Sequence, residues 1–132
     1  MIAVFSIKPQ YVSKILFGTK RIEYRRIKCV KPIEKILIYS TSPVSRVVGE
    51  VSVVNVLVGN VVSIWKLTKE YAGLDYDEFL HYFNGKSLAV GYVLTNPIKY
   101  SVSLSLTDIG VVHVPQSFCY LPPNHLTSLD SS

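Results

Sequence analysis

The spacing of apolar residues in the first part of the chain changes from extended to helical and back. Residues 2–7 are mostly apolar and predict a strand. Pro9 stands where proline is favoured in the first turn of a helix, and apolar residues at helical spacing follow it. Gly18 suits the C-cap of that helix, and residues 20–26 predict a second strand. We therefore expect strand, helix and strand in this order.

Two longer apolar segments follow, and both predict strands. Residues 34–41 carry apolar side chains on both faces, which is typical of a central strand. Residues 47–58 also alternate, but the apolar phase changes at Val53 and Val54. A change of phase within one strand indicates a bulge or a corner. We therefore expect a long, bent strand here.

Helical spacing returns over residues 60–71, with Gly73 after the end of that helix. Asp75 and Glu78 have the spacing of a capping box and predict the start of a second helix. That helix should stop near residues 84–85. Three of its side chains are expected to be buried: Phe79, Leu80 and Phe83.

The last part of the chain predicts two strands and a tail. Residues 87–94 alternate as a strand, Pro97 marks an edge or a break, and residues 101–105 predict a further short strand. Residues 122–132 are polar with two prolines, so we expect a flexible C-terminal tail. Residues 1–121 should then form one α+β domain, with a small mixed β-barrel flanked by helices.

Charge is distributed unevenly along the 132 residues. Residues 1–46 hold ten Lys or Arg and two acids, a balance of +8, whereas residues 47–132 hold four Lys or Arg and seven acids, a balance of −3. Such asymmetry indicates one basic face that could hold phosphates. The alternative is a solvated surface without a binding role.

Several classes of protein lack support in the sequence. Cys29 and Cys119 have no zinc-site spacing, and no glycine-rich phosphate loop or dinucleotide fingerprint is present. Residues 51–65 are rich in valine but too short and too interrupted to span a membrane. We therefore expect a cytoplasmic protein with no cofactor, no metal and no membrane partner.

Residues 18–26, Gly-Thr-Lys-Arg-Ile-Glu-Tyr-Arg-Arg, combine a turn glycine, four cations and one carboxylate. Strict strand periodicity places Arg21, Glu23 and Arg25 on one face and Lys20, Ile22 and Tyr24 on the other, which faces the core. Lys20 can share the site of Glu23 only if it still lies in the turn after Gly18. We expect that arrangement, because the core excludes a charged lysine.

This segment fills the pattern Gly-x-Lys-x-x-Glu-x-Arg and resembles the signature of ASCH domains, which are small PUA-like domains. Further blocks in the same order are similar to members of one ASCH subgroup: Ser-Ile-Lys-Pro at 6–9, Ile-Tyr-Ser-Thr-Ser-Pro at 38–43, Val-Gly-Glu at 48–50 and Pro-Gln-Ser-Phe-Cys-Tyr-Leu at 115–121. The resemblance covers residues 5–121. It implies a PUA-like β-barrel with a cleft beside the motif.

The resemblance also implies a range of functions. Members of the family have been proposed as RNA-binding modules, coactivator pieces and regulators, and the wider family includes a ribonuclease and an acetylcytidine amidohydrolase. The amidohydrolase type has a threonine where this chain has Glu23, and the candidates for its downstream glutamate are Glu50 and Glu70. The difference at Glu23 argues against that specific activity.

The residues of the motif allow more than one role. Lys20 could donate to phosphate or a base carbonyl, act as a nucleophile or base if its pKa is lowered, or be simply exposed. Glu23 could orient the cations through a salt bridge, accept from a nucleobase amino group or act as a general base. Arg25 has a planar fork that suits phosphate. Gln116 and Ser117 could read a base edge.

Three functions therefore remain open. The leading one is an RNA- or nucleotide-binding domain with a basic cleft, which could take part in the regulation of transcription. The second is a small hydrolase, either a ribonuclease or a modified-nucleoside amidohydrolase, with Lys20 and Glu23 as the reactive pair. The third is a protein-interaction adaptor in transcription or translation. The candidate ligand-binding residues are Gly18, Lys20, Glu23, Arg25, Arg26, Tyr39, Ser40, Gln116 and Ser117.

Overall fold

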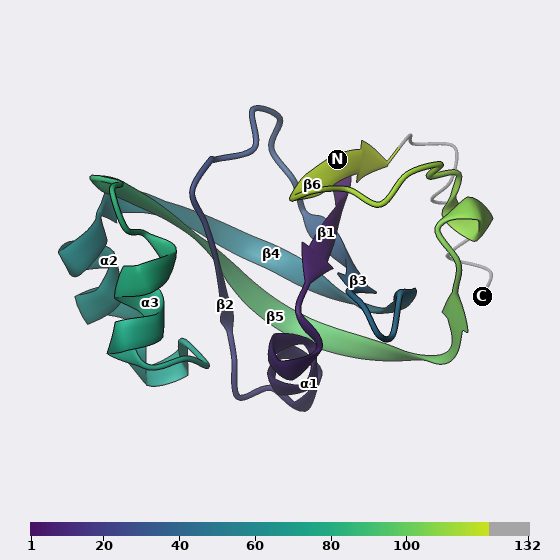
Figure 1. Ribbon diagram of the computed structural model, residues 1–132, viewed down its shortest axis with the longest axis horizontal. Helices are drawn as coiled ribbons and strands as arrows, with labels where there is room; N and C mark the ends of the chain where they lie inside the picture. The colour runs from purple at the N-terminus through teal and green to yellow at the C-terminus, as the bar shows by residue number, and fades with distance from the viewer. Residues whose placement is uncertain (122–132) are drawn as a thin grey trace.

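The computed structural model describes residues 1–121, which form one mixed sheet with helices around it (Figure 1). The six strands are β1 (Ile2–Ile7), β2 (Ile22–Arg25), β3 (Lys35–Ser40), β4 (Arg46–Asn60), β5 (Leu88–Leu104) and β6 (Phe118–Leu121). The helices are α1 (Pro9–Phe17), α2 (Val61–Thr68) and α3 (Tyr76–Tyr82), with short 3₁₀ helices η1 (Lys69–Tyr71) and η2 (Thr107–Ile109). The predicted α+β class is confirmed. The predicted tail, residues 122–132, lies outside the described residues.

The sheet is open, so the expected closed barrel is wrong. Its strand order is β2-β5-β4-β3-β1-β6, and β1 and β3 are parallel while the other neighbours are antiparallel. The two halves of the sheet are offset along the long β4–β5 pair. β3 pairs with residues 46–52 of β4, whereas β2 pairs with residues 90–93 of β5, opposite residues 55–58 of β4. The edge strands β2 and β6 are therefore displaced along the sheet and do not form a ladder with each other.

The long strands contain the irregularities that bend them. The phase change predicted at Val53 coincides with a shift in register between Val53 and Asn55 of β4. Of the two predictions for Pro97, the break is wrong because β5 continues through it, but the edge is confirmed because Pro97 lies beyond the residues of β5 that pair with β2. Between the paired positions Glu50 and Ser52, one residue of β4 faces two residues of β5, Asn96 and Pro97, and Asn96 adopts φ 54°. A bulge thus places the proline, which has no N–H, where the ladder is already interrupted.

The helix ends follow their sequence signals. Gly18 closes α1 with φ 98°, and its N–H donates to carbonyl oxygens of the last turn. Asn60 caps α2, and the predicted capping box opens α3 from Asp75. Two of the three side chains that were expected to be buried, Phe79 and Phe83, are buried.

One helical prediction and one strand prediction need correction. Leu80 is 39% exposed rather than buried, because the aromatic face of α3 that packs on α2 and β2 is formed by its neighbours. The closing strand β6 was not anticipated as a strand. It forms only because β1 offers it a free edge, from Ile2 to Phe5. None of the helices in residues 1–121 is long and apolar enough to cross a membrane.

Gly49 of β4 lies close to the backbone of β5, and this close contact allows a test of the fold. A Cβ at this position would lie 2.5 Å from the carbonyl oxygen of Ile98 and 3.0 Å from Leu16 Cδ2. We expect Gly49→Ala to lower the free energy of unfolding by about 1–3 kcal/mol, since backbone cannot move aside easily. Gly59→Ala, where the nearest atom is Ile64 Cδ1 at 3.4 Å, is the matched control with an effect within about 0.5 kcal/mol. Urea denaturation of both variants checks this, and equal losses would contradict it.

Candidate functional site

A cleft of about 770 Å³ lies where segments from both ends of the chain meet. Its lining comes from the end of β1 and the start of α1, from β2, from α3 and from the two residues that precede β6. Four Lys or Arg and two Glu line it, which gives a net charge of +2 with histidine neutral. The cleft is therefore built by tertiary contacts and favours an anionic ligand.

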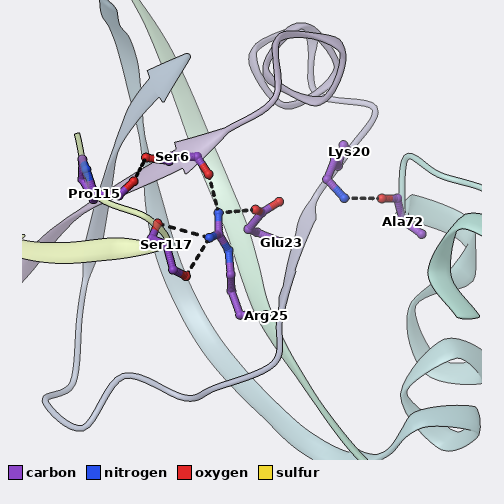
Figure 2. Close-up of polar contacts among 7 residues, drawn as sticks. All are labelled: Ser6, Lys20, Glu23, Arg25, Ala72, Pro115 and Ser117. Carbon is purple, nitrogen blue, oxygen red and sulfur yellow. Dashed lines mark hydrogen bonds and ion pairs between the residues drawn. The ribbon is translucent and has the colours of Figure 1, made fainter. Parts of the chain in front are cut away.

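Arg25 is the most heavily bonded side chain of the cleft (Figure 2). One terminal nitrogen donates to the carbonyl oxygen and the Oγ of Ser117, at 3.2 and 3.0 Å. The other donates to the carbonyl oxygen of Ser6 at 3.0 Å and to Glu23 Oε2 at 2.8 Å. The guanidinium also lies 4.6 Å from the ring centre of Phe5, and Arg25 is only 8% exposed. Its terminal nitrogens thus hold the protein together and are not free for a phosphate.

The segment before β6 is fixed in the same place by the backbone of β1. The Ser6 N–H donates to the carbonyl oxygen of Ser117 at 3.0 Å, and Ser6 Oγ donates to the carbonyl oxygen of Pro115 at 2.6 Å. Gln116, between them, is exposed and lines the cleft. Ser117 Oγ accepts from Arg25, so its own proton remains available to a ligand.

Lys20 lies in the turn before β2, as expected, yet it is only 3% exposed, so the reason for that expectation, the exclusion of a charged lysine from the interior, is wrong. Its Nζ donates to the carbonyl oxygen of Ala72 at 2.6 Å and lies 5.1 and 5.4 Å from the ring centres of Tyr24 and Tyr11. Burial lowers the pKa of Lys20 below its usual 10.5, and the nearby charge of Glu23 partly opposes this shift. Lys20 is therefore a buried cation held by a carbonyl and two aromatic rings.

The carbonyl that Lys20 holds belongs to the end of the α2–η1 helical segment. Lys14 Nζ donates to the next carbonyl, of Gly73, at 2.8 Å. Cations are favoured at this end of a helix because its last carbonyls are unpaired. Gly73 has φ 74°, and a Cβ there would lie 2.6 Å from the Lys20 Cβ. A side chain at Gly73 would therefore displace Lys20.

Two tyrosines connect the cleft to the helices. Tyr11 of α1 donates its hydroxyl to Glu78 Oε2 at 2.9 Å, and burial together with this bond raises the pKa of Tyr11 to about 12. Tyr24 exchanges a hydrogen bond with Thr68, and burial raises the pKa of Tyr24 to about 12. Both phenols are neutral at physiological pH and serve as hydrogen-bonding groups.

The structure brings together most but not all of the residues predicted for the site. Those that line the cleft are Lys20, Glu23, Arg25, Arg26, Gln116 and Ser117. Tyr39 and Ser40 do not line it, since both are buried in β3, where Tyr39 packs in a second core cluster. Gly18 lies beside a smaller hollow next to Lys20 and acts as a helix cap.

Several residues of the cleft were missed by sequence reasoning. They are Ser6, Ile7, Lys8, Gln10, Tyr11, Tyr24, Leu74, Glu78, His81 and Tyr82, and Thr41, directly after β3, also lines the cleft. The block at 6–9 was a usable signal for Lys8. Glu78 gave only the signal of a helix cap, which it is, and no local pattern shows that α3 faces α1. Neither Glu50 nor Glu70 lines the cleft; Glu50 pairs with Lys35 at 2.9 Å elsewhere in the sheet.

The free groups of the cleft define what it can bind. Glu23 Oε1 has no hydrogen-bond partner among the described residues, whereas Oε2 is bound to Arg25. Lys8 and Arg26 are exposed cations on the lining. Within residues 1–121 there is no group of three or more His, Cys, Asp or Glu placed to hold a metal ion. The available groups are donors and acceptors that suit phosphate and base edges.

The bonding of Arg25 predicts a large loss of stability when it is removed. Arg25→Ala leaves Glu23, which is 7% exposed, as a buried charge without its partner. We expect the free energy of unfolding to fall by about 3–5 kcal/mol. Arg26→Ala, one residue along but exposed, should lower it by about 1 kcal/mol or less. Urea denaturation at neutral pH compares the two, and similar losses would show that Arg25 does not hold the site together.

Known proteins resemble this chain both in sequence and in fold. No family model matches the chain. A protein of Zymomonas mobilis named ASCH domain-containing ribonuclease is 31% identical over 130 residues, which cover 96% of this chain and 83% of that protein. A crystal structure of ASCH from Zymomonas mobilis superposes with a TM-score of 0.89 at 25% identity, covering 98% of this chain and 94% of that one.

Two further relatives are much longer than this chain. They come from Ureaplasma parvum, are named ATP synthase subunit alpha and large ribosomal subunit protein uL22, and are 27% and 28% identical. The chain spans only 15% and 36% of their lengths, so it resembles a segment of each. The Zymomonas mobilis protein, by contrast, matches nearly end to end in sequence and in fold. The chain belongs to the ASCH domain family.

Proposed function

We propose that this ASCH domain binds single-stranded RNA, with one or two nucleotides held in the cleft. The observation that carries the proposal is the lining itself, in which a net positive charge surrounds a small set of unpaired hydrogen-bonding groups. Phosphate contacts supply affinity and base contacts supply selectivity in such sites. A volume of about 770 Å³ is in the range of pockets that enclose a small ligand.

The cations divide into an inner and an outer set. Lys20 and Arg25 are buried and bound to protein groups, so they set the potential of the cleft and position its walls. Lys8 and Arg26 are exposed and can meet phosphates directly. Lys8 also precedes α1, whose positive dipole end favours an anion nearby; Pro9 has no N–H there, and the N–H groups of Tyr11 and Val12 donate to the Lys8 carbonyl. In this proposal Arg25 is a positioning residue instead of a phosphate ligand.

Base recognition falls to the groups that remain unpaired. Glu23 Oε1 is an acceptor for an amino group of a base. The Gln116 amide offers one donor face and one acceptor, and the Ser117 hydroxyl offers a proton. The name of the Zymomonas mobilis relative, a ribonuclease, supports RNA as the ligand. The adaptor alternative lacks a comparable observation.

The proposal predicts salt-dependent RNA binding that depends on the outer cations. Affinity for single-stranded RNA should fall steeply with salt, because bound counterions are released. Lys8→Ala with Arg26→Ala removes two phosphate contacts and should flatten the slope of log affinity against log salt by about 1.4, at about 0.7 per contact. Fluorescence anisotropy over a salt series measures this.

The control for that experiment is a pair of exposed lysines away from the cleft. Lys69→Ala with Lys99→Ala changes the net charge equally, yet neither residue lines the cleft. This control should retain the wild-type slope. Absence of RNA binding by the wild-type protein, or equal slopes for the two double variants, would count against the proposal.

A second candidate function is RNA cleavage, and the burial of Lys20 favours it. A lysine whose pKa is lowered by desolvation can exist partly as a neutral amine and accept a proton. In such a step the amine takes the proton of a ribose 2′-hydroxyl, the 2′ oxygen forms a bond to the adjacent phosphorus, and the bond from phosphorus to the 5′ oxygen breaks. The departing oxygen takes a proton from solvent. Glu23 opposes the neutral amine, so the step requires that burial outweighs it.

Cleavage through Lys20 predicts a characteristic pH dependence. Activity should rise with pH toward the lowered pKa of Lys20, as the ammonium loses its proton. Lys20→Arg should abolish it, because guanidinium stays charged, with circular dichroism as the check that the variant folds. Mass spectrometry of RNA after incubation measures the products. If cleavage persists in folded Lys20→Arg protein, Lys20 is not the base.

The same incubation with acetylcytidine tests the amidohydrolase alternative. We expect no turnover, since Glu23 stands where that type of enzyme has a threonine. Deacetylation that depends on Lys20 would show this expectation to be wrong.

A further inference from the structure

A basic loop, residues 26–32, leaves the cleft and crosses the sheet toward β3. It forms most of the β2–β3 connection, residues 26–34, which projects beyond the sheet in Figure 1, and the one acid of that connection, Glu34, is paired with the N-terminal ammonium at 2.7 Å. Three residues of the loop are cations, Arg26, Lys28 and Lys31, and the loop itself contains no acid. All three are exposed, as are Ile27 at 71% and Val30 at 95%. This density of charge and exposed apolar surface is not explained by the fold.

Two hydrogen bonds, to Tyr92 and Tyr120, fix the backbone of the loop. Cys29 is buried in the main core, and its N–H donates to the Tyr92 hydroxyl at 2.8 Å. The Lys31 N–H donates to the Tyr120 hydroxyl at 3.0 Å, and its Nζ lies 5.4 Å from the Tyr120 ring centre. The backbone is thus anchored twice while the basic side chains point outward. Fixing a binding surface in advance reduces the entropy lost when a ligand binds.

Arg26 joins the loop to the cleft. Its Nε donates to the carbonyl oxygen of Tyr82 at 2.8 Å, and its guanidinium lies 4.4 Å from the Tyr82 ring centre. Both residues line the cleft. The terminal nitrogens of Arg26 have no hydrogen-bond partner within residues 1–121. The guanidinium is therefore oriented by stacking, with its planar fork available at the mouth of the cleft.

We propose that the basic loop is a second RNA subsite, over which a strand continues after it leaves the cleft past Arg26. The inference rests on the proposed function and narrows it: the ligand is a single-stranded RNA of several nucleotides instead of a free nucleotide or nucleoside. Lys28 and Lys31 contact phosphates, while Ile27 and Val30 offer apolar contact to bases. Basic grooves that follow the backbone, beside an aromatic ring on which a base can stack, are the usual surface for single strands, and Tyr82 next to Arg26 is such a ring.

RNA fits these observations better than an acidic protein does. Arg26 connects the loop to the cleft. The cleft already carries a net positive charge, and its acceptor Glu23 Oε1 can bind an amino group of a base. The Arg26–Tyr82 stack presents a delocalised cation and a ring in one place, which suits a base and its phosphate together. The binding of an acidic protein to the exposed cations would not require a cleft beside the loop.

The test compares two RNA lengths on one variant. Lys28→Ala with Lys31→Ala removes the two charges and leaves the anchoring backbone bonds, which come from N–H groups. Affinity for a single-stranded RNA of about 12 nucleotides should fall about tenfold at 0.1 M salt, with a salt slope flatter by about 1.4. Affinity for a dinucleotide, which fills only the cleft, should not change. Lys69→Ala with Lys99→Ala is the control for both probes.

The outcomes separate this inference from the function on which it rests. If the wild-type protein binds both probes but the Lys28 and Lys31 variant binds the longer RNA as tightly as wild type, the loop subsite is refuted and the cleft proposal stands. If the variant loses affinity for both probes equally, the loop does not act as a separate subsite. If the wild-type protein binds neither probe, both proposals fail.

Discussion

The guanidinium of Arg25 holds together the two edges of a sheet that does not close. Arg25 ends β2, one edge strand, and its partners Ser6 and Ser117 belong to β1 and to the segment just before β6, the other edge. Since the edges are offset, backbone hydrogen bonds cannot join them, and a long side chain with five donors does so instead. The cleft lies at this junction. Its geometry therefore depends on a charged side chain that is sealed from water and paired with Glu23.

Lys20 shows a related dependence between charge and shape. Its ammonium holds the end of the α2–η1 segment through Ala72, and its aliphatic part packs against Gly73. The helices that form one side of the cleft are thus attached to β2 partly by the residue that gives the cleft its inner charge. Loss of function on removal of Lys20 would by itself say little about catalysis, because the same change detaches the helices. The pH dependence and the guanidinium variant separate these effects.

The two sets of cations divide the work between structure and binding. The inner pair, Lys20 and Arg25, are bonded to protein and little hydrated, so their field acts on a ligand without direct contact at Arg25. Lys8, Arg26 and the basic loop beyond them are exposed, and in the proposed function they exchange water or counterions for phosphate. A domain of this size can in this way keep a rigid site and still offer a salt-sensitive surface to a long ligand.

The sequence alone determined the local structure and the chemistry of the motif. The helix caps at Gly18 and Asp75 and the irregular β4 follow from short-range sterics, capping and strand periodicity. Lys20 lies before β2, as expected, and four blocks of residues indicated the family. Whether the sheet closes, where β6 pairs and which distant groups reach the cleft depend on the register between strands far apart in the chain. Ser117 reaches Arg25, and Glu78 reaches Tyr11, only in the folded chain, so these contacts and the internal bonding of Arg25 were decided by the tertiary structure.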